Sequence, residues 1–595
     1  MFTNDHGKWM FLAGCILSMT AYREPLQAAN AYVVRNLTSD IPDLADYTDP
    51  NLKGAWGISE SGTSPFWIAD AGTGLSTLYS SIGSPISLVV TIPASKAAMS
   101  GTAGTPTGTV YNGTTGFAIA TGDPAAFIFA TLDGTISGWN HSVNATTAQV
   151  MVDNSASGAV YTGLAIGTSG SNTYLYAANF SNGTIDVYDS TFTAVTLPSA
   201  FQDSNLPAGY APFNVQNIAG NLYVAYALQN TAKNFPVTAA GDGYVDVYSP
   251  AGTLMQRLVS GGALNAPWGL AIASSGFGDY AGDLLVGNFG DGTINVFNPT
   301  TGVSIATLDD VYGIPIAIPN LWALQAGNGG SGGDSNAIYF TAGIPGPDMG
   351  NHGLFGRIQA APIVTATNVV NGASFQPPIA PNTWVTITGG NLSGTTRVWD
   401  ADDFVNGALP TNIDSVSVSV NGTYAFVEYV SPTQLNVLLP PGLAAGQATV
   451  QTFNFGLASS QVTVQIQDVA PAFFLQNDGK HIAATHADGS LVGPSTTAGA
   501  APAAPGETIV LYGTGFGVTN PAATNQLITT ALPLVTLPTI TIGGTATTPI
   551  FAGLTYAGLF QINVTVPAST ASGDVPVVAL VGTTASPAGA VIAVQ

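Results

Sequence analysis

Three polar side chains at equivalent positions of an internal repeat are the residues of this chain best suited to bind a metal ion. Asp70, Asn179 and Asn288 each end an apolar strand-like segment and precede a glycine turn in three copies of the repeat. Carboxylate and amide oxygens are ligands that calcium accepts, and equivalent positions in a closed ring of repeats meet around one rim. The pattern predicts a candidate calcium site at these three residues and no other cofactor.

A second interpretation of the same residues is structural. Asp and Asn commonly accept hydrogen bonds from the backbone of the turn that follows them. The remaining copies carry Leu132, Leu228 and Ala342 near the corresponding place, so a ring of six ligands is not available. This second interpretation is therefore favoured.

A run of aspartates near the start of the chain is a weaker candidate. Four of them fall at every third position from Asp40 to Asp49. A calcium loop of the common kind needs acids at alternate positions around a central glycine, whereas Pro42 and Pro50 stiffen this segment. The spacing predicts a solvated loop.

The histidines carry no catalytic motif. Beyond residue 31 they are His141, His352, His481 and His486, and none has a partner acid or nucleophile at a recognisable spacing. A pairing of His141 with His352 across one face of the protein is conceivable, but no sequence motif supports it. Histidine catalysis needs an oriented partner, so the sequence alone assigns no catalytic residue.

Composition restricts the fold and the partners. The 595 residues indicate several domains, and 71 glycines with only 7% charged residues favour a turn-rich all-β chain over helical bundles. The net charge of −23 disfavours nucleic acid and anionic lipid surfaces, which need clustered Lys and Arg.

Residues 1–30 read as an export signal, which predicts a secreted, periplasmic or extracellular protein. Lys8 precedes an uncharged stretch from Trp9 to Tyr22, and Ala29 to Ala31 form a small-x-small cleavage pattern. Lipidation of Cys15, the single cysteine, is a minor alternative because Leu12 to Cys15 resemble a lipobox. No later segment is apolar enough to anchor the chain in a membrane.

A first set of repeats predicts a six-bladed β-propeller over residues 31–360. Each unit has a short strand, an aromatic-aliphatic strand ending in Asp or Asn, and then Gly-x-[IVL]-x-x-[YFW]. Clear copies begin at Trp56, Gly163, Trp268 and Trp322, and two weaker ones run from Phe117 to Trp139 and from Phe213 to Tyr248. Units of this length are typical of propeller blades.

Two further expectations follow from the same repeats. The strand from Tyr32 to Leu37 precedes the first copy, so we expect it to close the ring as the outer strand of the last blade. The aromatic residues that end the third strands are expected to pack between neighbouring sheets rather than to bind a ligand. These residues are Trp139, Tyr188, Tyr248 and Phe297.

A second set of repeats predicts two immunoglobulin-like β-sandwiches, over residues 361–470 and 471–595. The segment 384–392 is echoed at 509–516, and Gln434 to Pro440 is echoed at Gln561 to Pro567. Both echoes alternate apolar and polar residues, as half-buried strands do. Residues 494–505, rich in Ala, Pro and Thr, are expected to form a loop or linker.

At these residues the chain resembles known families. Residues 49–52 followed by Trp56 to Ile58 resemble an uncharacterised family of exported bacterial propellers of the NHL-like type. Residues 371–375, 471–474 and 505–517 resemble a C-terminal domain of acidobacterial secreted proteins, which is similar to a pair of IPT/TIG-type immunoglobulin folds. The resemblance implies architecture and leaves activity open.

Two hypotheses about function remain. The first is a non-enzymatic binding or scaffold protein whose propeller face binds a ligand, an extracellular polysaccharide or a surface protein, with the sandwiches as spacers. The second is a calcium-dependent hydrolase, similar to six-bladed lactonases, or a lyase on the propeller rim, which rests on fold analogy. The scarcity of His, Lys and Glu favours the first, and the oligomeric state stays open.

Overall fold

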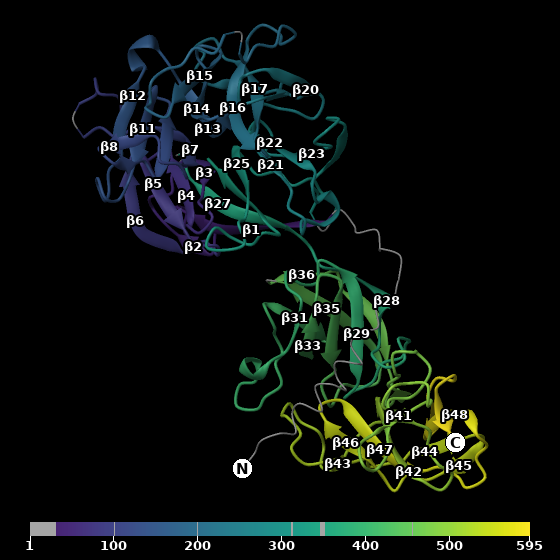
Figure 1. Ribbon diagram of the computed structural model, residues 1–595. Helices are drawn as coiled ribbons and strands as arrows, with labels where there is room; N and C mark the ends of the chain where they lie inside the picture. The colour runs from purple at the N-terminus through teal and green to yellow at the C-terminus, as the bar shows by residue number, and fades with distance from the viewer. Residues whose placement is uncertain (1–30, 100, 199, 311–312, 346–350, 455) are drawn as a thin grey trace. The chain divides into compact units, whose positions relative to one another are not determined.

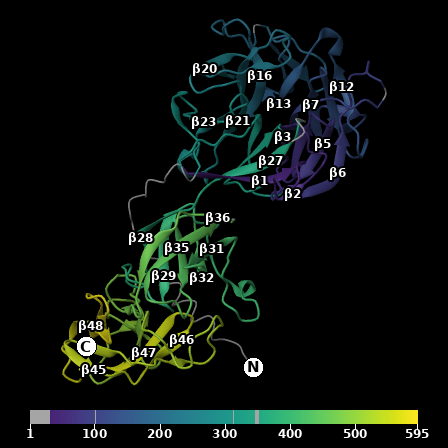
Figure 2. The same ribbon diagram turned by 180° about the vertical axis from the view of Figure 1, so that it is seen from behind.

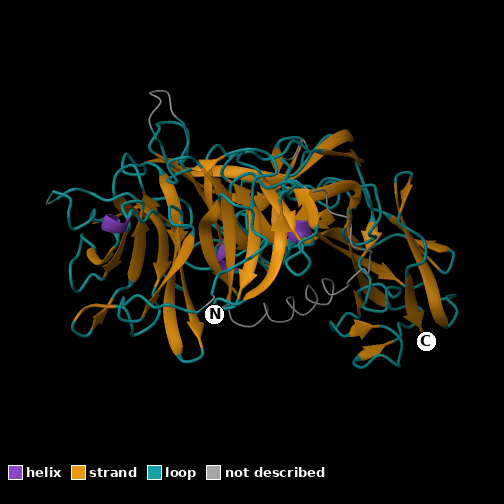
Figure 3. Cartoon of the chain, turned by 90° about the horizontal axis from the view of Figure 1, so that it is seen from above, coloured by secondary structure: helices purple, strands orange, loops and turns teal. Residues whose placement is uncertain are grey.

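The computed structural model describes residues 31–595 except 100, 199, 311–312, 346–350 and 455. Strands dominate, and the helices among the described residues are three single 3₁₀ turns (Figure 3). No helix in that part of the chain is long and apolar enough to cross a membrane. The chain forms two compact units, Ala29–Ala360 and Ala361–Gln595, which correspond to the propeller and the sandwiches. The expected all-β class is confirmed, whereas the predicted export signal and Cys15 lie outside the described residues.

The first unit is a ring of six antiparallel sheets, five of them with four main strands (Figure 1). The first blade contains β3 (Ala55–Ser59), β4 (Phe66–Asp70), β5 (Leu75–Tyr79) and β6 (Pro85–Thr91). The second contains β7 (Pro106–Tyr111), β10 (Phe127–Thr131), β11 (Thr135–Trp139) and β12 (Gln149–Asp153). The third contains β13 (Tyr161–Ser169), β14 (Asn172–Asn179) and β15 (Thr184–Asp189). The fourth blade contains β16 (Tyr210–Ile218), β17 (Asn221–Gln229), β19 (Tyr244–Tyr248) and β20 (Leu254–Ser260). The fifth contains β21 (Pro267–Ile272), β22 (Leu284–Asn288), β23 (Ile294–Phe297) and β24 (Ser304–Thr307). The sixth contains β25 (Leu321–Ala326), β26 (Ile338–Ala342), β27 (Leu354–Ala360) and β1 (Tyr32–Ser39).

The ring closes through its first strand, as predicted. β1 pairs antiparallel with β27, with Tyr32 opposite Ala360 and Ser39 opposite Leu354 (Figures 1 and 2). The last blade therefore combines strands from both ends of the unit, and the ring has no unpaired blade edge at its seam.

The inner strands meet at a repeated point of close approach. Gly57, Gly108, Gly163 and Gly269 stand at the same position of four inner strands, and a Cβ at Gly57 would overlap the carbonyl oxygen of Thr107 in the next blade. The pairing between inner and second strands also shifts register near this point in all six blades. Such bulges bend a strand locally.

This geometry corrects one boundary. The inner strand of the second blade is β7, which precedes Phe117, whereas the sequence placed the start of that copy at Phe117. The strand escaped notice because Thr107, Gly108 and Thr109 lack the aromatic residue or Leu that marks the first strand of the other copies.

The aromatic residues of the third strands lie in the core, as expected. Trp139, Tyr188, Tyr248 and Phe297 are all at most 5% exposed. Trp139 packs against Trp67 of the neighbouring blade with ring centroids 4.8 Å apart. Packing of sheet on sheet therefore explains these aromatic residues.

The second unit contains two β-sandwiches. The first has one sheet of β28 (Ile363–Asn371), β29 (Trp384–Gly390), β34 (Gln434–Leu438), β33 (Phe426–Val430) and β30 (Arg397–Val398), facing β31 (Val416–Val420), β32 (Thr423–Tyr424), β35 (Gly446–Asn454), β36 (Leu457–Ala458) and β37 (Val462–Ile466). The second has β38 (Ala472–Phe473), β39 (Ala484–Thr485), β40 (Leu491–Val492), β41 (Ala500–Ala501), β42 (Thr508–Thr514), β47 (Leu559–Thr565), β46 (Phe551–Tyr556) and β43 (Leu532–Pro533) in one sheet, and β44 (Thr539–Ile542), β45 (Thr545–Thr547), β48 (Gly573–Val581), β49 (Thr584–Ala585) and β50 (Val591–Val594) opposite.

The two sandwiches are copies at the level of single residues. Gln434 pairs with Thr388 in the first, and Gln561 pairs with Tyr512 in the second. Each glutamine donates through Nε2 to the Oδ1 of the asparagine two residues later, at 2.9 Å in both copies. The echoed motifs therefore occupy equivalent paired strands.

The segment 494–505 is part of the second sandwich and does not separate two domains. β41 pairs with β40, and the backbone N–H of Ala503 donates to Ala593 O at 2.9 Å. Small residues allow this irregular segment to lie against the sheet, which composition alone did not distinguish from a linker.

Candidate functional site

The three predicted ligands lie at the same place in their blades. Asp70, Asn179 and Asn288 end the second strands β4, β14 and β22, and each pairs with the first residues of the inner strand beside it. The repeat therefore positions them as the sequence indicated, on one end of the propeller.

Each of these side chains is hydrogen bonded within its own blade or the loop beside it. Asp70 Oδ2 accepts from Thr77 N at 3.1 Å and Thr77 Oγ1 at 2.8 Å. Asn179 Nδ2 donates to Asp186 Oδ2 at 2.8 Å, again seven residues later. Asn288 Nδ2 donates to Ala263 O at 2.8 Å. These bonds tie the end of each blade's second strand to the strand or loop next to it.

The residues that follow two of the predicted ligands, Phe180 and Phe289, pack in the apolar cluster between the inner strands of the ring. Phe289 stacks on Trp322 at 4.3 Å, and Trp322 stacks on Trp56 at 3.5 Å. Because successive side chains of a strand alternate in direction, the polar residue before each Phe is directed away from this cluster.

No described hydrogen bond joins Asp70, Asn179 and Asn288 to one another. Burial, together with the neighbouring carboxylates Asp49 and Asp40, raises the pKa of Asp70 well above its ordinary value. Among the described residues, no group of three or more His, Cys, Asp or Glu is arranged to hold a metal. Calcium binding at these three residues stays a prediction.

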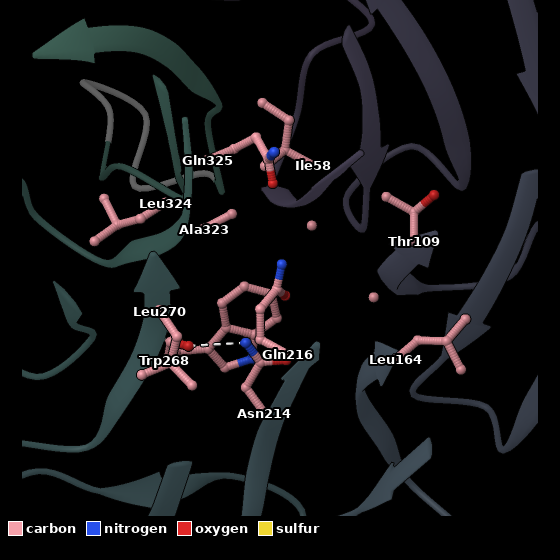
Figure 4. A pocket seen from close by; sticks show the side chains of 12 residues that line it. Ile58, Thr109, Leu164, Asn214, Gln216, Trp268, Leu270, Ala323, Leu324 and Gln325 are labelled. Carbon is pink, nitrogen blue, oxygen red and sulfur yellow. Dashed lines mark hydrogen bonds between the residues drawn. The ribbon is translucent and has the colours of Figure 1, made fainter. Parts of the chain in front are cut away.

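A small cavity, here called the channel mouth, lies at the other end of the inner strands, and apolar side chains line it together with four neutral polar ones (Figure 4). Gln216 and Gln325 extend toward the cavity from different inner strands, with Thr109 on a third strand. Asn214 Nδ2 donates to Trp268 O at 2.8 Å and so joins two blades. The cavity measures about 10 Å³, which is room for about one water. A larger ligand must therefore lie over the mouth.

Glu60 is the acidic residue near this mouth. It directly follows inner strand β3, and its Oε2 is buried with no hydrogen-bond partner among the described residues. Gly332 lies against this carboxyl group, since a Cβ there would overlap Oε2. Burial raises the pKa of Glu60 to about 8, although a hydrogen bond with Gln325 lowers it.

The sequence did not single out Glu60 or Gln216, but it held a signal for Glu60. The corresponding position of the other five inner strands carries only neutral residues, namely Tyr111, Ile166, Asn217, Ile272 and Ala326. One acid among six repeats marks a departure from the structural pattern.

The aspartates near the start of the chain act separately, and the prediction of a solvated loop is wrong for two of them. The Asp40 side chain is 2% exposed and shares a 2.7 Å hydrogen bond with His352 Nδ1. Asp49 is buried and accepts from Tyr79 OH at 2.9 Å. Their partners are remote in sequence, so spacing could not reveal them.

The described hydrogen-bond partners of the histidines do not form a catalytic arrangement between His141 and His352. His481 lies between Asp478 and Asp574, 2.9 Å from the latter. His486 Nδ1 is 2.5 Å from Glu507. His141 is exposed and His352 is paired with Asp40, and no described hydrogen bond links these two across the propeller.

Fold and site together define a class: a six-bladed propeller with a neutral channel mouth, followed by two immunoglobulin-like sandwiches. The model of the IPT/TIG domain matches residues 373–477. The chain is 30% identical over 344 residues to uncharacterized protein R648 of Acanthamoeba polyphaga mimivirus, covering 56% of this chain and 82% of R648. It is 31% identical over 327 residues to uncharacterized protein L690 of the same virus, in a match that covers 53% of this chain and 84% of L690. The chain belongs to the same family as these proteins.

Solved structures that match part of this chain include a protein of unknown function from Bacteroides thetaiotaomicron, 13% identical with a TM-score of 0.36, in a match that covers 55% of this chain and 76% of that one. A streptogramin B lyase is 9% identical with a TM-score of 0.34, covering 55% and 98%. The IPT/TIG resemblance is thus confirmed, whereas the bacterial and acidobacterial relationship stays a prediction beside these viral relatives.

Proposed function

We propose that this chain is an exported binding or scaffold protein whose propeller presents its channel mouth to a neutral ligand, such as an extracellular polysaccharide. The sandwiches act as a spacer that holds the propeller away from its point of attachment. Export rests on the sequence of residues 1–30, and the choice of a neutral ligand rests on the mouth.

The observation that supports binding over catalysis is the chemistry of the channel lining. The lining residues include Thr109, Asn214, Gln216 and Gln325, and none of them is charged. Amide and hydroxyl groups donate and accept hydrogen bonds without transferring protons near neutral pH. Glu60 is the titratable group placed beside this mouth, and its Oε2 has no described partner that would orient it, whereas hydrolysis needs an oriented acid, base or nucleophile. A surface protein is the alternative partner, and its binding would use the same mouth.

Blocking the mouth tests this function. Gln216→Trp places a large side chain at the mouth, and Gln256→Trp places the same side chain on the exposed outer strand β20 of the same blade. We expect the full-length protein and Gln256→Trp to be retained by insoluble neutral polysaccharides, and Gln216→Trp to lose most of this retention. Equal retention of both variants would show that the mouth is not the binding site.

A further inference from the structure

The second unit contains a cavity at the junction of its two sandwiches that is larger than the one at the propeller mouth. Its volume is about 320 Å³, at the lower end of the range of about 300–1,000 Å³ for small-molecule sites. Three segments form its walls: residues 372–376 after β28, residues 472–475, which include β38, together with Gly479, and residues 587–590 between β49 and β50.

The junction that carries this cavity is held by hydrogen bonds between the copies. Trp384 N donates to Thr514 Oγ1 and Trp384 Nε1 donates to Ala557 O, both at 3.0 Å. Asn371 Nδ2 donates to Ala470 O at 2.9 Å, and its Oδ1 accepts from Ala373 N at 2.9 Å. Asn371 therefore ties the first wall to the segment that leads into the second wall.

The cavity has an apolar floor and a polar, open rim. Ala373, Phe473 and Phe474 are each 4% exposed at the floor. Phe375 is half-buried in the wall, with φ of 54° in a turn that Asn371 closes. A ring in this place offers a flat apolar surface to a ligand.

The rim supplies hydrogen-bonding groups that no described protein group uses. Within the described residues, the backbone N–H groups of Ala588 and Gly589 have no protein acceptor, and both residues are exposed. Gln376 also lines the cavity and is exposed. These groups match a ligand that carries several hydroxyl groups.

No charged side chain lines the cavity. The charged residues flanking Gly479 are paired with other groups: Lys480 with Asp574 at 2.5 Å, and Asp478 with His481. A phosphate, carboxylate or amine would enter without a counter-charge, and burying it would cost free energy. The ligand that fits is neutral.

We propose that this cavity binds a neutral saccharide unit, with Phe375 against the apolar face of the sugar ring and the rim groups on its hydroxyls. A peptide fits less well, because extended peptides add to a free sheet edge, whereas two of the three walls here are loops and β38 in the third is already paired with β42. The site deepens the proposed function by giving the sandwiches a ligand, but it does not depend on the propeller mouth.

Calorimetric titration of the full chain with cellohexaose, maltohexaose, mannohexaose and xylohexaose tests the proposal. We expect at least one of them to bind, and Ala588→Trp, which fills the rim, to weaken its binding at least tenfold. Ala571→Trp places the same side chain on an exposed loop outside the cavity and should leave affinity and melting temperature unchanged. Retention on the corresponding insoluble polymer shows whether the unit comes from a polysaccharide end or from a free oligosaccharide.

Three results would overturn the site. They are no binding of any of the four probes, equal affinity in Ala588→Trp and wild type, or displacement of the sugar by a neutral extended peptide. Gln216→Trp distinguishes the two proposals, because it should leave this titration unchanged. Loss of the titration in Gln216→Trp alone would place the sugar at the propeller mouth and refute the cavity.

Discussion

Replacing Glu60 by glutamine should stabilise the propeller, and only at a pH where the carboxyl group would otherwise be charged. Burial raises the pKa of Glu60 from its ordinary 4.5 to about 8. The unfolded chain releases this proton near pH 4.5 and the folded chain holds it until about pH 8. Wild-type stability therefore falls as pH rises through this window, and the full cost is present above pH 8.

The size of the effect follows from the pKa shift and the remaining solvent contact. A shift of this size corresponds to at most about 5 kcal/mol, but Glu60 keeps part of its surface in water, so we expect about 1–2 kcal/mol after allowing for solvent screening. At about 2.1 cal/mol/K per residue, a unit spanning Ala29–Ala360 gains about 2 °C.

Scanning calorimetry of the full chain at pH 5 and pH 9 measures this difference. Glu60→Gln should raise the melting temperature of the propeller transition by about 2 °C at pH 9 and by much less at pH 5. Glu428→Gln is the matched control, because burial raises the pKa of Glu428 to about 7 in the other unit. An equal shift at both pH values, or a less stable variant at pH 9, would refute the assignment of a buried carboxyl group with an unbonded Oε2 at this mouth.

Three more outcomes are expected. Gly57→Ala should lower the melting temperature of the propeller by several degrees because a Cβ there overlaps the next blade, whereas Gly62→Ala, with open space around it, should have no effect. His481→Asn should destabilise the sandwich unit more at pH 5.5 than at pH 8.5: the two carboxylates raise the pKa of His481, so its contribution is complete below the unfolded pKa and is lost as pH rises through the folded one. Asn288→Ala should lower the melting temperature equally in calcium and in chelator, since it removes hydrogen bonds worth about 1 kcal/mol each; a calcium-dependent rise in wild type that the variant loses would instead place a cation there.

The blades and sandwiches could be predicted because each rests on a local pattern that recurs. Strand alternation, a glycine turn and an aromatic residue at a fixed offset located most blade strands, and the closing strand from Tyr32 followed from its position before the first copy. The second blade was misplaced because its inner strand β7 has Thr107 and Thr109 beside Gly108, with neither an aromatic residue nor a Leu next to the glycine. Local patterns identify a strand only where the typical side chains are present.

The candidate sites depend on contacts that no local pattern encodes. Asp40 and His352 lie 312 residues apart in the sequence, and the partnerless oxygen of Glu60 is buried against Gly332 in another blade. The cavity in the second unit is formed by three segments that come from both sandwiches. The sequence did mark two of these segments as motifs, at 371–375 and 471–474, without indicating that they face one cavity.

The seam of the propeller has a mechanical consequence. The chain enters the ring at Tyr32 and leaves it at Ala360, and these two residues are direct partners in the pairing of β1 with β27. Tension between the flanking segments therefore loads one hydrogen-bonded pair at a time, from Tyr32 toward Ser39, instead of loading the whole ladder in shear. When the two flanking segments are pulled apart, we expect the pairing of β1 with β27 to unzip first, while the strands of the other five blades stay paired.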